Sequence, residues 1–220
     1  MVDKKKVANY VKNRNNFLQV QKFGKITIFF KDRFINDINY QQVLQKVDNI
    51  LPDHIINLID IIYVGDFDFL NKRKVNAAYM DGAIYTSYVQ DDELDLTDDI
   101  VHEFAHAVEE KYGYQIYLDR KIESNFLAKK RRLKRLLSHD HYNTQHYDFS
   151  NINYDQEFKQ FVSEEIGYKK LDSYITGLFL GGYSTVSLGE YFARGFEEFY
   201  LGDTLYLKLI CPYIYNKLVY

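Results

Sequence analysis

The run from Asp98 to Val108 is the feature that most restricts what this chain can fold into. It holds His102, Glu103 and His106 in the pattern H-E-x-x-H, with apolar residues between and around them. On an α-helix, residues four apart share one face and lie about 6 Å apart along the axis. Two imidazoles placed in this way can bind one Zn²⁺, and the glutamate beside the first can reach a water next to the ion. The run therefore predicts a helix that presents a metal site.

Both ends of this helix carry recognisable signals. Thr97 is a typical N-cap residue, and Asp98 and Asp99 favour the positive end of the helix dipole. Gly113 is a typical stop signal. We expect the helix to begin after Thr97 and to end before Gly113. The alternative interpretation is a helix with two surface histidines that bind no metal.

Composition restricts the class of protein. The chain has 220 residues, of which 46% are hydrophobic, and this indicates a globular fold with a substantial core. A net charge of −3 gives no global attraction to nucleic acid or to an anionic membrane, so no nucleic-acid partner is expected. The single cysteine, Cys211, excludes an internal disulfide. We find neither a secretory signal nor a membrane span, which leaves localisation open between the cytoplasm and delivery by a non-classical route.

Hydrophobic patterning predicts strands first and helices later, the order of an α+β fold with a small mixed sheet. Residues 1–20 are polar and form a possible tail, and Asp81-Gly82 predicts a hairpin whose second strand, Ile84 to Val89, is the edge of the sheet. We interpret residues 1–220 as one domain. The other expected strands are Ile26–Phe30 and Leu58–Val64, and the expected helices are Tyr40–Ile50, Leu118–Leu137, Glu157–Gly167, Gly189–Leu201 and Thr204–Leu218.

A catalytic zinc takes three protein ligands, so a third ligand must come from elsewhere in the chain. No third histidine follows the motif at the spacing H-x-x-G-x-x-H, which leaves a carboxylate on a later helix. Glu190, at the start of an aromatic-rich helix, is the best candidate. The other interpretation of Glu190 is a capping box, because Ser187-Leu-Gly-Glu190 has the pattern in which the glutamate bonds back to the N-cap amide.

Two blocks of the chain resemble a known family. H-E-F-A-H-A-V-E-E-x-x-G at 102–113 and E-Y-F-A-R-G-F at 190–196 are similar to the metallopeptidase domain of anthrax lethal factor and the Pro-Pro endopeptidases. The closing segment, 207–218, also resembles that family. The resemblance implies a zincin-like fold of the gluzincin type with Glu190 as the third zinc ligand. It also implies that Tyr183, seven residues before Glu190, assists the transition state.

The chain departs from the family in two ways. The family carries an acidic residue one turn after the glutamate ligand, where it can orient a ligand histidine, and this chain has Arg194 there. Glu197 or Glu198 could substitute only by a longer reach. The separation of His106 and Glu190 also exceeds the family's usual one, which implies an insertion within residues 114–180. We expect the part from Ser138 to Tyr154 to be a mobile loop near the cleft.

Two further signals have ordinary explanations. The basic run from Lys129 to Arg135 could contact phosphate or anionic lipid, but such a run more often forms a solvated helix face. His139, His141 and His146 lie in a polar segment that could hold a second metal, but three loop histidines without a fixed spacing are more typical of an exposed loop.

Together these features predict a zinc-dependent endopeptidase. Zn²⁺ held by His102, His106 and Glu190 activates water, Glu103 acts as the general base, and Tyr183 stabilises the oxyanion. The substrate is a peptide or protein that lies along the hairpin strand Ile84 to Val89. The alternative is a non-catalytic, zinc-stabilised interaction module that binds a partner through the basic helix or the His-rich loop.

Overall fold

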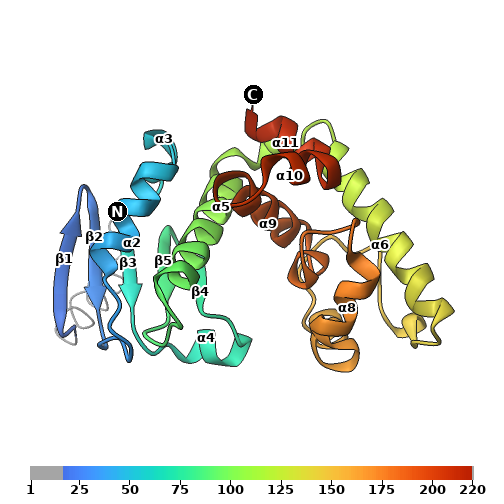
Figure 1. Cartoon of the computed structure of the whole chain (residues 1–220), viewed down its shortest axis with the longest axis horizontal. Helices are drawn as coiled ribbons and strands as arrows, with labels where there is room; N and C mark the ends of the chain where they lie inside the picture. The colour runs from blue at the N-terminus through green and yellow to red at the C-terminus, as the bar shows by residue number, and fades with distance from the viewer. Residues whose placement is uncertain (1–16, 220) are drawn as a thin grey trace, which may run out of the picture. The chain divides into compact units, whose positions relative to one another are not determined.

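The computed structural model describes residues 17–219, so the predicted tail lies mostly outside the described residues. The chain forms two compact units, one ending at Ala107 and the other beginning at Val108. The boundary lies inside a single helix, α5 (Glu93–Tyr117), which Figure 1 shows as one uninterrupted element. The first unit contains a sheet and the second consists of helices, which confirms the prediction of an α+β fold.

The sheet of the first unit is mixed, with five strands in the order β1-β2-β3-β5-β4. The β1–β2 and β4–β5 pairs are antiparallel, and the β2–β3 and β3–β5 pairs are parallel. β1 was not predicted from the sequence, because it begins within the polar segment 1–20, which we expected to be a tail. The strands are β1 (Gln19–Phe23), β2 (Ile26–Phe30), β3 (Ile61–Val64), β4 (Ala77–Met80) and β5 (Ala83–Thr86).

The two faces of the sheet carry different side chains. On one face Ile28, Ile62 and Ile84 stand in register across the three central strands and are fully buried. On the other face Tyr63 stacks between Phe29 and Tyr85, with ring centroids 5.4 and 4.9 Å apart. Because successive side chains of a strand point to opposite faces, this alternation fixes the register of the three strands.

The hairpin forms where the sequence predicts it, but the predicted edge strand was wrong. Asp81 and Gly82 both have positive φ, 52° and 79°, as a two-residue type I′ turn requires. β5 pairs with both β3 and β4, so it lies inside the sheet, and β4 forms the edge. Met80 at the end of β4 is exposed, whereas Ile84 on β5 is fully buried.

Three further helices belong to the first unit. α2 covers the range predicted from its periodicity, and its core-facing Val43, Leu44 and Val47 are buried. α2 and α3 lie between β2 and β3 along the chain, and α4 lies between β3 and β4. Their bounds are α2 (Tyr40–Ile50), α3 (Asp53–Ile56) and α4 (Asp68–Arg73).

Helix α5 is longer at both ends than its signals predicted. It begins at Glu93 because Oδ1 of Asp92 accepts hydrogen bonds from the backbone N–H groups of Leu94 and Asp95 at 2.8 and 2.9 Å. Thr97 is therefore not the N-cap; its hydroxyl donates to the carbonyl of Glu93 one turn earlier. Gly113 does not end the helix, which continues to Tyr117; beyond the glycine, Ile116 is buried and the ring of Tyr117 packs against Phe192.

The second unit is helical, with one π-helical segment and two short 3-10 segments. The predicted helix Thr204–Leu218 is broken into two, because Pro212 cannot continue the first and instead begins the second. No helix within residues 17–219 is long and apolar enough to cross a membrane. The elements are α6 (Lys121–His139), η1 (Thr144–His146), α7 (Gln156–Gln160), the π-helix η2 (Phe161–Gly167), α8 (Tyr168–Ile175), η3 (Gly182–Thr185), α9 (Leu188–Leu201), α10 (Thr204–Ile210) and α11 (Pro212–Val219).

The basic run on α6 is not a fully solvated face, which corrects the prediction. Lys129 and Lys130 are 7% and 1% exposed. The ammonium of Lys129 donates to the hydroxyl of Tyr191 and the carbonyl of Ile210, at 2.7 and 2.8 Å, and lies 3.5 Å from Sγ of Cys211. These two lysines are therefore structural, and only the remaining basic residues of the run can face a partner.

The start of α5 can be tested by removing its cap. We expect Asp92→Ala to lower the free energy of unfolding by about 1 kcal/mol, because two N–H groups of the first turn lose their acceptor. Urea unfolding followed by circular dichroism measures this difference. Asp91→Ala, at the neighbouring exposed position, is the control and should change it little. Equal stability of the two variants would contradict the assigned cap.

Candidate metal centre

The two histidines of the motif lie on one face of α5. Their ring centroids are 5.2 Å apart and the ring planes are nearly perpendicular, at 73°. Both side chains are half-buried, whereas the neighbouring Phe104 and Ala105 are fully buried in the core. The helical spacing therefore does what the sequence predicts, and it presents two imidazoles side by side.

Glu103 is held against the edge strand of the sheet. It is only 6% exposed, and its Oε2 accepts a hydrogen bond from the backbone N–H of Tyr79 on β4 at 2.5 Å. A buried carboxylate needs such a donor, because burial without one costs several kcal/mol. The sequence identified Glu103 from the motif, but it gave no indication that the backbone of β4 would hold it.

Glu190 is the third residue of α9, three positions after the N-cap Ser187. Oγ of Ser187 accepts a hydrogen bond from the backbone N–H of Glu190 at 3.1 Å, so the serine half of the predicted capping box is present. This bond uses the backbone of Glu190 and not its side chain. The cap and a ligand role for the carboxylate, which is 7% exposed, are therefore compatible.

Contacts within the second unit fix α9 against the last part of α5. A Cβ built on Gly189 would lie 3.0 Å from Oε2 of Glu109, so a larger residue at this position would require the Glu109 carboxylate to shift. Oε1 of Glu109 accepts a hydrogen bond from the hydroxyl of Tyr117 at 2.6 Å, and the ring of Tyr117 packs edge-on against Phe192. Gly189, the residue before Glu190, therefore lies beside Glu109 within the second unit.

His102, His106 and Glu190 each offer a ligand atom, and these atoms lie within 4.8 Å of one another. Ligands bound at about 2.0–2.2 Å to one ion lie about 3 to 4 Å apart, so a small adjustment brings the three onto one metal. Two imidazoles and one carboxylate form a donor set that suits zinc. Within the described residues this is the one group of three with such spacing.

The His-rich loop does not form a second site. His139, His141 and His146 are all exposed, and they form no metal-binding group among residues 17–219. Nδ1 of His139 instead lies 3.1 Å from Oδ1 of Asp140. The ordinary interpretation of an exposed loop therefore holds for this segment.

Tyr183 lies on η3, in a loop with no spare room. Gly181 has a φ of 117°, which L side chains rarely adopt, and a Cβ on Gly182 would lie 2.4 Å from the ring of Tyr168. Side-chain bonds also hold the loop, because the hydroxyls of Ser184 and Thr185 donate to the carbonyls of the two glycines at 2.7 Å. Gly181 thus provides a backbone angle that other residues rarely adopt, and Gly182 allows the close approach of the Tyr168 ring.

Tyr168 is a residue that the sequence analysis missed. Its hydroxyl is buried near Ser163 and makes no hydrogen bond of normal geometry among the described residues. Burial, and then the negative charge of Glu190, raise its pKa to about 12. Tyr168 follows directly after the π-helix η2, and π-helical turns are frequent at functional sites. No motif in the sequence marks it among the 21 tyrosines.

The acidic residues considered as replacements at Arg194 have other roles. Glu197 forms an ion pair with Arg194. Glu198 lies at the end of α9, where Oε1 accepts a hydrogen bond from the backbone N–H of Asp203 at 2.9 Å. Glu198 is therefore part of a helix terminus rather than a partner for a ligand histidine.

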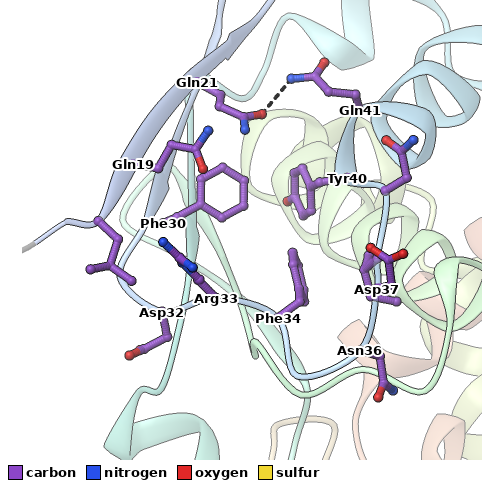
Figure 2. A pocket seen from close by; sticks show the side chains of 13 residues that line it. Gln19, Gln21, Phe30, Asp32, Arg33, Phe34, Asn36, Asp37, Tyr40 and Gln41 are labelled. Atoms are coloured by element: carbon purple, nitrogen blue, oxygen red, sulfur yellow. Dashed lines mark hydrogen bonds between the residues drawn. The ribbon is translucent and has the colours of Figure 1, made fainter.

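A separate pocket lies in the first unit, beside β1 and the loop that leads into α2. Figure 2 shows Phe30, Phe34 and Tyr40 facing one another in it, and a hydrogen bond of 2.8 Å between Gln21 and Gln41 at its side. Its volume is about 510 Å³. The pocket contains no histidine, and none of the predicted site residues lines it.

No protein-family model, curated protein or solved structure matches this chain.

Asp99, one turn before His102, gives a prediction about pH. Burial, and then the charge of Asp95, raise its pKa to about 7, although Gln90 donates a hydrogen bond to it. The unfolded chain ionises this carboxyl near pH 4, whereas the folded chain keeps the proton until about pH 7. The folded state therefore loses stability as the pH rises through this interval.

We expect Asp99→Asn to remove this loss. Between pH 5 and pH 8, the free energy of unfolding of the wild type should fall by about 2 kcal/mol more than that of the variant. Urea unfolding in the presence of a chelator measures it without a contribution from metal. Asp91→Asn, at an exposed position, is the control. Parallel pH profiles for wild type and Asp99→Asn would contradict the assignment.

Proposed function

We propose that the protein is a zinc-dependent endopeptidase of the gluzincin type with a zincin-like fold. The observation that carries this proposal is the group formed by His102, His106 and Glu190, whose ligand atoms lie within 4.8 Å of one another. A buried glutamate, Glu103, stands beside the first ligand on the same helix. Two imidazoles, one carboxylate and an adjacent acid make up the residues that metal-assisted hydrolysis needs.

A bound zinc ion would supply a Lewis acid that polarises the scissile carbonyl and lowers the pKa of a water. The carboxylate of Glu103 would take the proton of the attacking water and pass it to the leaving nitrogen. Its hydrogen bond from the Tyr79 amide holds the carboxylate in one orientation while it does so. A general base must be positioned in this way, since its efficiency depends first on geometry.

The edge of the sheet supports a peptide as substrate. β4 pairs with β5 on one side only, and it is the strand whose backbone contacts Glu103. An extended peptide that adds to the open side of β4 would lie beside the base and gain main-chain hydrogen bonds. In this proposal Tyr183 donates a hydrogen bond to the oxyanion that forms when water attacks.

Metal binding can be measured directly. We expect the purified protein to bind about one zinc per chain, and His102→Ala, His106→Ala and Glu190→Ala each to weaken zinc binding at least tenfold. Titration against a chromophoric chelator gives the affinities, and His139→Ala in the exposed loop is the matched control. Zinc binding that survives loss of Glu190 would remove this residue from the ligand set.

Catalysis can be separated from metal binding. We expect Glu103→Gln to keep zinc and to lower peptide hydrolysis by about 10²–10⁴-fold, because the base is lost while the ligands remain. Glu110→Gln, an exposed glutamate on the same helix, is the control. Cleavage of a peptide library by zinc-loaded protein is the assay. If zinc stabilises the fold but no peptide is cleaved, the chain is a zinc-stabilised interaction module instead.

A further inference from the structure

Arg194 occupies the position at which the resembling family has an acid, and its contacts show what it does here. Its Nε donates a hydrogen bond to the backbone carbonyl of Leu180 at 2.9 Å. Leu180 lies directly before Gly181, so the arginine on α9 holds the start of the loop that carries Tyr183. All of these residues belong to the second unit.

Glu197 orients the arginine. It lies one turn further along α9 and forms an ion pair with the guanidinium of Arg194. The side chain of Glu197 is 9% exposed and that of Arg194 is 39% exposed, so water screens the pair only in part. The planar guanidinium can engage a carboxylate and a carbonyl at the same time in fixed directions, which an ammonium group does less well.

The rest of the loop has its own restraints, so the arginine acts at one end. The ring of Tyr168 packs against Gly182, and the hydroxyl of Thr185 donates to the carbonyl of Gly182. The carbonyl of Tyr183 accepts a hydrogen bond from the backbone N–H of Val186 at 3.1 Å. These bonds close the loop after Gly182, while Arg194 fixes its beginning.

We propose that Arg194, oriented by Glu197, is a positioning residue that holds the Leu180–Thr185 loop so that Tyr183 is presented for catalysis. The inference rests on the proposed function for the role of Tyr183, but the contact with the loop stands independently. It also gives the departure from the family pattern a function. The arginine does not orient a ligand histidine through a carboxylate; it orients the tyrosine through the backbone.

The loop contact is tested first, without any assay of activity. Hydrogen exchange followed by mass spectrometry should show peptides covering residues 180–186 exchanging about tenfold faster in Arg194→Met, because one restraint is lost. Arg131→Met, at an exposed position on α6, is the matched control and should not change them. Unchanged exchange in Arg194→Met would overturn the proposal. Arg194→Lys should have an intermediate effect, because an ammonium lacks the fixed directions of the guanidinium. Unchanged exchange in peptides from the rest of the chain shows that the variants fold.

The catalytic part is tested by a double-mutant cycle. We expect Arg194→Met to lower kcat about 10–100-fold with KM and zinc content unchanged, and to add no further loss in a Tyr183→Phe background. Multiplicative losses in the double variant would overturn the link to Tyr183. A wild-type protein that cleaves no peptide would instead refute the proposed function, and the exchange experiment would still decide whether Arg194 holds the loop.

Discussion

The uninterrupted helical repeat of α5 is the constraint on which the candidate site depends. One helix sets His102 beside His106, turns Glu103 towards the backbone of β4 and places Glu109 against Gly189 at the start of α9. Each of these contacts needs its own position on the 3.6-residue repeat. Asp92 fixes where that repeat begins, and the helix continues past Gly113 to Tyr117. A break in the helix between His102 and His106 would take the two imidazoles off their common face.

Three charged side chains, those of Glu103, Arg194 and Lys129, each form a hydrogen bond with a backbone atom. The carboxylate of Glu103 receives an amide N–H, the guanidinium of Arg194 reaches a carbonyl, and the ammonium of Lys129 reaches another. Backbone groups are held by the elements that carry them, so they move less than side chains do. A partner of this kind costs little conformational entropy and keeps a buried charge in one orientation. Each of these three side chains is therefore held in one orientation by the backbone atom that it contacts.

The sequence predicted the features that depend on local periodicity and missed those that depend on distant contacts. The Asp81-Gly82 hairpin, the range of α2 and the face shared by the two imidazoles follow from spacing alone, and all three are present. The position of β5 inside the sheet, the bond from Tyr79 to Glu103 and the burial of Lys129 depend on residues far away in the chain. Likewise, the sequence indicated only that an acidic residue is replaced by Arg194, and not that Arg194 donates a hydrogen bond to the carbonyl of Leu180.

The burial of Cys211 gives this chain a built-in reporter. It is the single thiol of the protein, it is fully buried, and burial raises its pKa, although the ammonium of Lys129 opposes this shift. A thiol reagent can reach it only when the core around α6, α9 and α10 opens, and only the thiolate reacts. The rate at which Cys211 is labelled under native conditions therefore reports how often the second unit opens. The wild-type chain thus allows the stability of one unit to be followed separately from the other, without any added probe.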